Sequence, residues 1–259
     1  MSLRSPVRLL AAFGVLLALW WGIALVLRNP VFPPPSVAFE GFLRLLGDGL
    51  VHHVGASLKR VGVATAWAVL LALPLGVFLG THPKWDGRIA PYVYLTYPVP
   101  KTALMPVFFL LLGLGDLSRE AILFLILFYQ LFIAVRDAVR AVDPAYVLSV
   151  RALGARPWDL YRHVYLPAAF PALLTALRVN TGIALSVLFL VETYATEEGL
   201  GYLIQRAQSR YAYGEIFAVV ALLGLLGLVL YVILDVLEAL WAPWARRRKE
   251  GELVWTEER

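Results

Sequence analysis

The sequence predicts an all-α membrane protein with about six transmembrane helices. Hydrophobic residues make up 60% of the 259 positions and charged residues only 16%, which is too little charge to coat a soluble surface of that size. The apolar residues also gather into about six stretches, each near the ~20 residues that a helix needs to cross ~30 Å of hydrocarbon. Much of the protein surface is therefore expected to face lipid.

The apolar stretches are expected to form helices over residues 7–27, 61–80, 89–112, 121–135, 172–191 and 216–241. The first stretch has a signal peptide as its alternative interpretation. Its apolar run is long and no small-residue cleavage site follows it, which favours a membrane helix. Ser118 is expected to cap the fourth helix, since a serine side chain accepts hydrogen bonds from a first helical turn.

The chain is expected to divide into three parts. Residues 1–56 would hold the N-terminal cytoplasmic end, the first transmembrane helix and an extracytoplasmic loop. Residues 57–241 would form a core of five transmembrane helices, with a long cytoplasmic loop at 137–168. Residues 242–259 would form a charged cytoplasmic tail.

The basic residues predict the orientation. With the N-terminus in the cytoplasm, about fifteen of the 23 Lys and Arg residues fall on the cytoplasmic side, as the positive-inside rule expects. The net charge of +5 is thus explained by topology, and nucleic-acid binding is not expected. We predict a multi-pass membrane protein with its N-terminus in the cytoplasm, in contact with lipid.

The residue types that usually carry chemistry are absent or scattered. The chain has no cysteine, which excludes disulfides and thiolate metal sites. His52 and His53 are adjacent and should point apart on a helix, while His82 and His163 stand alone, so no metal site is expected. No Gly-rich phosphate loop with a following lysine occurs. We therefore expect no cofactor and no ATP hydrolysis by this chain.

The third apolar stretch contains several prolines, which remove backbone donors and bend membrane helices. It is interpreted either as a broken segment that lines a pathway or as a kinked helix whose Lys101 reaches an interface. Gln130 is expected to hydrogen-bond between helices. Glu192 is expected at the water boundary beside Thr193 and Thr196, or else facing a cavity. The candidate pathway residues are Pro98, Pro100, Lys101, Thr102, Gln130 and Glu192.

The loop after the fourth stretch has the clearest local pattern. Asp143 can cap a short helix, Pro144 suits its first turn, and Gly154 suits a left-handed stop. Pro157 is expected to start a second short helix that ends at Leu166-Pro167. Apolar residues at helical spacing form one face of the first helix: Tyr146, Val147, Val150 and Leu153. Such a helix suits docking in the groove of another protein, with the membrane surface as the alternative.

This loop resembles the signature loop of the permeases of ATP-binding-cassette importers. The family pattern is Glu-Ala-Ala, three residues, Gly, nine residues, Ile, one residue and Leu-Pro; Gly154, Val164, Leu166 and Pro167 fall at its spacing. Leu148, Ser149 and Val150 stand where Glu-Ala-Ala would be, which suggests apolar docking in place of an ion pair. By this resemblance the coupling residues are Tyr146, Val147, Leu148, Ser149, Val150, Leu153, Gly154, Val164, Leu166 and Pro167.

The resemblance extends over nearly the whole chain. The segments 97–106 and 113–115 are similar to the third span of the nitrate, sulfonate and taurine permease group, and 199–204 to the loop after its fifth span. It implies a type I importer permease fold and a homodimeric pore. It also implies ATPase subunits and an extracytoplasmic solute-binding protein as partners, and a location in the plasma membrane of a bacterium. Small organic or inorganic anions or vitamin precursors are the implied solutes.

Two other classes of protein remain as alternatives. A secondary transporter or channel not driven by ATP would have no need of the helix-Gly-helix loop at 143–167. A membrane enzyme should show polar catalytic residues clustered within its spans, and the sequence contains no such cluster. Both alternatives are therefore less favoured than an importer permease.

Overall fold

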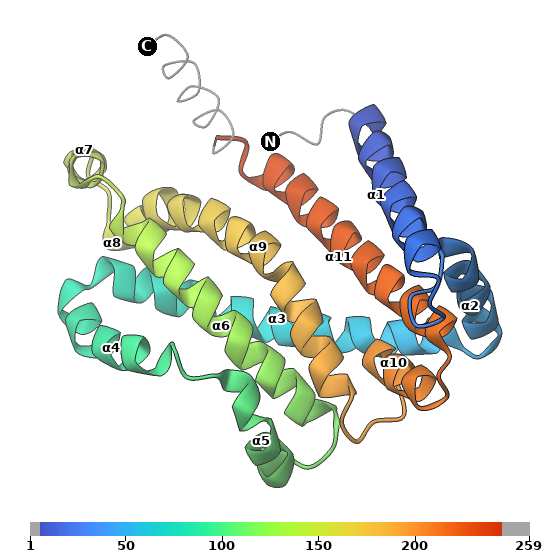
Figure 1. The fold of residues 1–259 in the computed structure, drawn as a ribbon. Coiled ribbons are helices and arrows are strands. Elements are labelled where there is room, and N and C mark those ends of the chain that lie inside the picture. Colours follow the sequence, from blue (N-terminus) through green and yellow to red (C-terminus); the bar gives the residue numbers. More distant parts are fainter. Residues whose placement is uncertain (1–5, 245–259) are drawn as a thin grey trace. The chain divides into compact units, whose positions relative to one another are not determined.

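The computed structural model describes residues 6–244, and every regular element within them is helical (Figure 1). The long helices are α1 (Pro6–Leu27), α3 (Leu50–Thr81), α6 (Asp116–Arg140), α9 (Leu166–Glu192) and α11 (Tyr213–Trp241). The shorter ones are α2 (Pro35–Gly47), α4 (Pro83–Thr96), α5 (Met105–Leu112), α7 (Pro144–Ala152), α8 (Pro157–Leu160) and α10 (Leu200–Ser209). A 3-10 turn, η1 (Lys101–Leu104), precedes α5, and a π turn, η2 (Tyr161–Tyr165), precedes α9.

The chain forms two compact units. The first unit runs up to Ser57 and includes Glu192–Leu225; the second comprises Leu58–Val191 and the residues from Leu226 on. The predicted boundary after residue 56 thus falls next to the end of the first segment, while Glu192–Leu225 joins that segment from far along the chain. Most of the predicted tail at 242–259 lies outside the described residues.

The second unit has a core of aliphatic side chains from α3, α6 and α9, among them Ala68, Leu131 and Leu173. Small residues set how closely the helices approach. A Cβ added at Gly76 would lie 2.7 Å from a methyl carbon of Val135, and one added at Gly80 would lie 2.7 Å from Val139. Glycine on α3 therefore lets α6 pack directly on its backbone, as is common between membrane helices.

The first unit is closed by aromatic and glycine contacts. Trp20 of α1 stacks on Phe217 of α11, with ring centroids 5.8 Å apart, and donates a hydrogen bond to the carbonyl of Pro33. Gly41 of α2 lies so close to Gly214 that a Cβ on it would be 2.6 Å from that backbone. These contacts join the start of the chain to the segment that enters α11.

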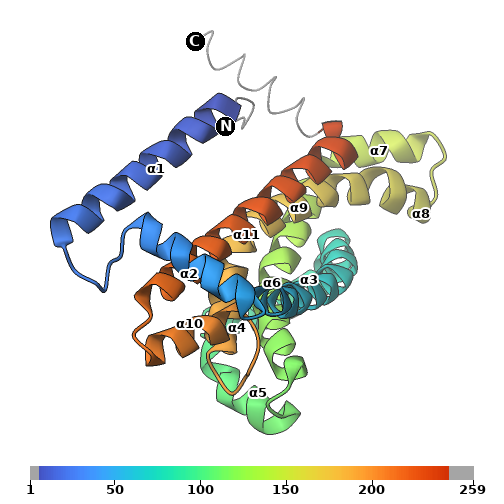
Figure 2. The same cartoon turned by 90° about the vertical axis from the view of Figure 1, so that its right-hand side faces the viewer.

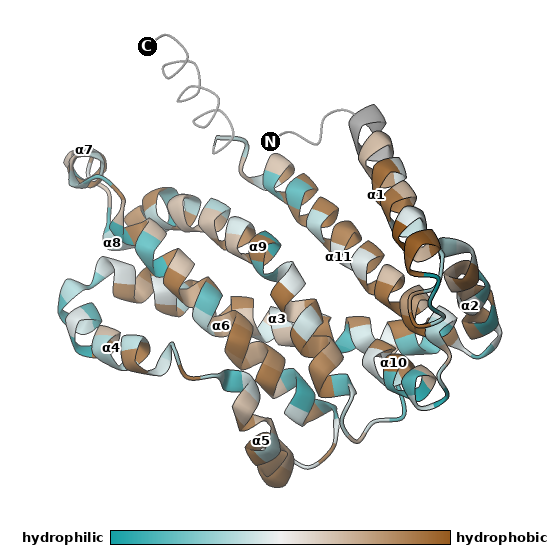
Figure 3. Cartoon of the chain, viewed as in Figure 1, coloured by the Kyte–Doolittle hydropathy of each residue, from teal (hydrophilic) through white to brown (hydrophobic). Residues whose placement is uncertain are grey.

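Four or five of the six predicted spans are long and apolar enough to cross a membrane in the described part of the chain. Four helical stretches are long and apolar enough to cross a membrane: Leu50–Thr81, Asp116–Arg140, Pro157–Glu192 and Tyr213–Trp241. The pair Pro83–Thr96 and Lys101–Leu112, bent by 78°, makes a fifth span if the two helices are counted as one. The first expected span, 7–27, coincides with α1, whose 22 residues extend about 33 Å at ~1.5 Å per residue. Figure 3 shows the apolar character of α5 and α11.

Two local predictions about these helices are wrong. Gly115, not Ser118, is the N-cap residue of α6, and the hydroxyl of Ser118 donates instead to the carbonyls of Gly113 and Phe108. Leu166-Pro167 does not end a helix, because Pro157–Glu192 is a continuous helical stretch. The π turn explains this continuity: its wide turn removes the clash that Pro167 would otherwise make with the preceding turn of an α-helix.

Candidate functional site: a docking loop and a bent pathway segment

The loop helix α7 has the ends that its sequence predicts. The Asp143 carboxylate caps it by accepting a hydrogen bond from the backbone N–H of Ala145 at 2.8 Å, and Pro144 occupies the first turn. Gly154 has a φ of +84° with no atom within 4 Å of a Cβ built on it, so its backbone conformation alone requires glycine there. The helix is thus closed at both ends by local chemistry.

The apolar side chains of α7 are left uncovered. No residue of this helix is buried, and Val147 and Val150 are only half-buried. Several large apolar side chains are exposed, by the following fractions: Tyr146 57%, Leu148 63%, Leu153 88% and, on α8, Trp158 70%. Figures 1 and 2 show α7 projecting beyond the ends of α6 and α9. This unpartnered apolar surface is larger than the single predicted stripe, since Leu148 and Trp158 extend it.

The later residues of the predicted coupling set lie after α7, in the turn η2 and at the start of α9. Val164 is 3% exposed and packs into the unit, while Leu166 and Pro167 belong to the first turn of α9. The indole of Trp244 donates a hydrogen bond to the carbonyl of Pro167. Val164 is therefore enclosed within the unit, whereas Leu166 is 36% exposed, and the coupling role of all three residues stays a prediction.

A buried ion pair anchors the end of α6 just before α7. Arg136 donates from two nitrogens to the carboxylate of Asp86 near the start of α4, and both residues are 3% exposed. Arg140, one helical turn later, pairs with the same carboxylate. This cluster was not predicted. Two arginines four residues apart on an apolar helix do indicate an acidic partner. Asp86 lies 50 residues before Arg136, however, so the sequence alone could not identify it as that partner.

The third span is broken between α4 and α5 by a bend of 78°, and its role in lining a pathway stays a prediction. α4 ends at Thr96, the exposed Pro98 and Pro100 follow, and Lys101 and Thr102 enter the 3-10 turn η1. The Lys101 ammonium donates to the carbonyls of Thr96, at 3.2 Å, and Tyr97. It also lies 4.5 Å from the ring centroid of Tyr129 and 5.1 Å from that of Tyr97. Pro100 has no N–H, so it cannot donate the hydrogen bond that the carbonyl of Thr96 would accept in a continued helix.

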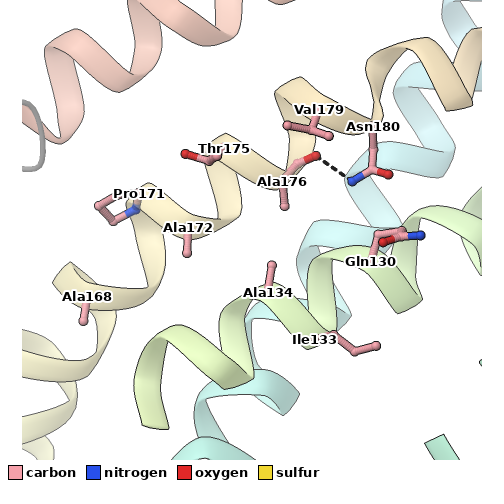
Figure 4. Close-up of a pocket in the computed structure, with 10 residues that line it drawn as sticks. All are labelled: Gln130, Ile133, Ala134, Ala168, Pro171, Ala172, Thr175, Ala176, Val179 and Asn180. Carbon is pink, nitrogen blue, oxygen red and sulfur yellow. Dashed lines mark hydrogen bonds between the residues drawn. The ribbon is translucent and has the colours of Figure 1, made fainter. Parts of the chain in front are cut away.

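Gln130 connects this bend to a cavity. Its Oε1 accepts a hydrogen bond from the Tyr97 hydroxyl at 3.3 Å. The cavity has a volume of about 630 Å³ and lies open between α6 and α9. Four of its ten lining residues are alanine and three are polar (Gln130, Thr175 and Asn180), and Gln130 and Asn180 lie near one end (Figure 4). Gln130 thus hydrogen-bonds as expected of a polar residue in a span, and it also faces open space.

Glu192 is 0% exposed. It is enclosed by protein and not in contact with water, whereas its polar neighbours in the sequence had suggested a position at the water boundary. Its carboxylate accepts hydrogen bonds from the Ser57 hydroxyl and the backbone N–H of Gly201, each at 2.9 Å. The Ser57 oxygen in turn accepts from the N–H of Leu200. A buried carboxylate is tolerated where such donors surround it, so Glu192 fixes the start of α10 and is enclosed.

The two adjacent histidines reach the same segment. His53 accepts a hydrogen bond from the backbone N–H of Gly199 at 3.2 Å, and His52 lies 3.0 Å from the Glu198 carboxylate. Their rings are 5.7 Å apart. This carboxylate could not be assigned to them beforehand, because Glu198 is 146 residues distant along the chain.

The chain belongs to the family described as binding-protein-dependent transport system inner membrane component, which matches residues 72–247. It is 32% identical to the taurine transport system permease protein TauC of Escherichia coli over 82% of this chain and 80% of the relative. It is 27% identical to SsuC of Bacillus subtilis, named as a putative aliphatic sulfonates transport permease protein, over 79% of this chain and 75% of the relative. A formylaminopyrimidine transport permease protein, ThiX, of Halalkalibacterium halodurans is 23% identical, covering 80% and 84%.

The fold has solved counterparts. A chain of the inward-facing MetNI methionine transporter superposes with a TM-score of 0.56 at 21% identity, covering 72% of this chain and 93% of that chain. The predicted fold class is therefore confirmed. The protein is the inner-membrane, multi-pass permease subunit of an ATP-binding-cassette importer, and it works with a separate ATPase subunit and a solute-binding protein.

Proposed function

We propose that α7 is the element through which the ATPase subunit moves this permease. The observation that carries the proposal is the exposed apolar surface of Tyr146, Leu148 and Leu153 on a helix closed by Asp143 and Gly154. Apolar area that is left exposed on a rigid helix stabilises a complex when a partner's groove covers it. The docking is apolar because no carboxylate occupies positions 148–150.

Gly154→Val tests this role against a matched control, Gly49→Val. Both glycines have φ near +80° and open space around the site of a Cβ, so both substitutions strain the backbone alike by about 1–2 kcal/mol. Gly154→Val is expected to keep normal abundance and to lose most ATP-driven uptake. Gly49→Val is expected to keep uptake per molecule. Equal uptake per molecule in the two variants would contradict the proposal.

The solute is proposed to be a small anion of the sulfonate type. The support is the likeness to relatives named for taurine and aliphatic sulfonates, together with a lysine in the bent span whose partners are backbone carbonyls. Uptake of labelled taurine, methanesulfonate and nitrate by the complete transporter tests this class. Uptake restricted to a vitamin precursor, as the name of the formylaminopyrimidine relative would suggest, would replace it.

Two copies of this chain are proposed to form one pore, embedded in lipid, with ATP held by the partner subunits and no cofactor on this chain. Pro98, Pro100, Lys101, Thr102 and Gln130 are proposed to line the pathway; Glu192 is left out because it is enclosed. The mass of the purified complex tests the assembly: two copies are expected, and one copy or two different permease chains would contradict it.

The N-terminus is proposed to be cytoplasmic, on the basis of the positive-inside bias. Since the chain has no native cysteine, single introduced cysteines report the side of the membrane cleanly. Ala155→Cys should react with an impermeant thiol reagent only in opened cells, and Ser209→Cys should react in sealed cells. The reverse pattern would contradict this orientation.

A further inference from the structure

The Lys101 ammonium has an unusual set of partners for a charge within a membrane span. It contacts two backbone carbonyls and the faces of two tyrosines. In the part of the chain that the structure describes, no carboxylate pairs with it. Three arginines of spans in the second unit differ from it, since Arg60, Arg136 and Arg178 each pair with acidic side chains.

The surroundings of Lys101 hold the positive charge in place without neutralising it. Carbonyl oxygens and ring faces attract a cation as partial charges, so the net charge of the site stays at +1. Hydrogen bonds fix both rings: the Tyr129 hydroxyl lies 2.9 Å from that of Thr96, and the Tyr97 hydroxyl donates to Gln130. A charge kept in a span without a counter-ion usually marks a path for an ion or substrate.

The same hydrogen bond leads from the charge to the cavity between α6 and α9. Gln130 uses its Oε1 for Tyr97, which leaves its amide nitrogen as a donor. The Thr175 hydroxyl lines the same space, and the remaining walls are mostly small apolar side chains (Figure 4). Hydrogen-bond donors beside one cation suit the oxygens of an anion, and anion-selective pores use lysine or arginine in this way.

We infer that Lys101, oriented by Tyr97 and Tyr129, is the anion-binding site of the translocation pathway and takes the charged oxygens of a sulfonate or similar small oxyanion. The solute replaces the carbonyls of Thr96 and Tyr97 as the partner of the ammonium while it passes. This inference rests on the proposed anionic solute and adds the residue that recognises it. A lysine that only caps the end of α4 is the structural alternative.

Lys101→Cys in the complete reconstituted transporter separates the two roles, because the native chain offers no other thiol. With taurine as the first probe, we expect normal abundance and at least a tenfold loss of uptake. An aminoethyl thiol reagent, which rebuilds a lysine-like ammonium, should restore at least half of the uptake. A sulfonatoethyl reagent, which adds a negative charge, should restore none. Lys84→Cys removes one charge elsewhere and should transport at the wild-type rate.

The rate of thiol modification with and without solute distinguishes a binding lysine from a merely structural one, because solute protects only a thiol in its binding site. Saturating taurine should slow modification of the thiol in Lys101→Cys at least threefold and should leave modification of the thiol in Lys84→Cys unchanged. Wild-type uptake by Lys101→Cys, or the absence of protection, would overturn the inference while leaving the proposed solute class in place. If the wild-type transporter carries none of taurine, methanesulfonate and nitrate, the proposed solute class fails and the inference fails with it.

Discussion

The short helices α7 and α10 make an informative comparison, since each is bordered by a glycine with positive φ. α7 has no buried residue, and Gly154 beside it has open space where a Cβ would stand. Five of the ten residues of α10 are buried, and a Cβ on Gly199 would overlap the Glu192 carboxylate. α7 is held mainly by its capped ends, and α10 is fixed by contacts within its unit. Glycine therefore ends an exposed helix in one place and allows close packing against a carboxylate in the other.

The largest effect is expected from Gly199→Ala. Its φ of +111° disfavours any side chain, and the added methyl would meet a carboxylate held by the hydroxyl of Ser57 and the N–H of Gly201. We expect a loss of about 3 kcal/mol or more in stability, measured as lower abundance and a lower melting temperature in detergent. Gly115→Ala is the control, because Gly115 has a negative φ and open space where a Cβ would stand. It should change abundance and melting temperature little.

Glu192→Ala should have a somewhat smaller effect. It removes the carboxylate that accepts from the Ser57 hydroxyl and the N–H of Gly201, so both buried donors lose this hydrogen bond. The expected cost is about 2–3 kcal/mol, again measured by melting in detergent. Tyr146→Ala is the matched substitution on α7 and should leave the melting temperature nearly unchanged, because its side chain is 57% exposed. Equal destabilisation by the two variants would remove the contrast between the helices.

The smallest stability effect is expected at the cap of α7. Asp143→Ala loses the hydrogen bond to the N–H of Ala145 and should destabilise the local helix by about 1 kcal/mol. Such fraying should reduce uptake per molecule several-fold with little change in melting temperature. Asp143→Asn, which keeps an accepting oxygen, should behave like the wild type. A large fall in abundance for Asp143→Ala would instead assign α7 a role in the folded core.

The contrast between the two helices also explains which features the sequence could predict. The cap at Asp143, the proline at the first turn and the stop at Gly154 depend on neighbouring residues only, and all three are confirmed. The enclosure of Glu192 depends on Ser57, which lies 135 residues earlier, so hydropathy and local polarity indicated the wrong environment. The predicted cap at Ser118 is wrong for a related reason, since its hydroxyl donates a hydrogen bond to the carbonyl of Phe108, ten residues earlier.

The bend of the third span was predictable only in part. Its prolines predicted an interruption, but the 78° angle and the placement of Lys101 beside Tyr97 and Tyr129 depend on packing against α6. No residue pattern before Pro167 predicted the π turn at Tyr161–Tyr165. A proline after a Leu usually suggests a helix boundary, and only the wider turn made continuation into α9 compatible with it.

Cross-linking between α7 and the ATPase subunit tests the central claim most directly. Leu148 is 63% exposed, so Leu148→Cys should fold normally and present a single thiol on the proposed docking surface. In the assembled transporter, a short bifunctional thiol–amine reagent should join position 148 to the ATPase subunit, and Ser209→Cys on α10 should give no such product. A cross-link from Ser209→Cys, or none from Leu148→Cys in a transporter that hydrolyses ATP and transports solute, would contradict the account.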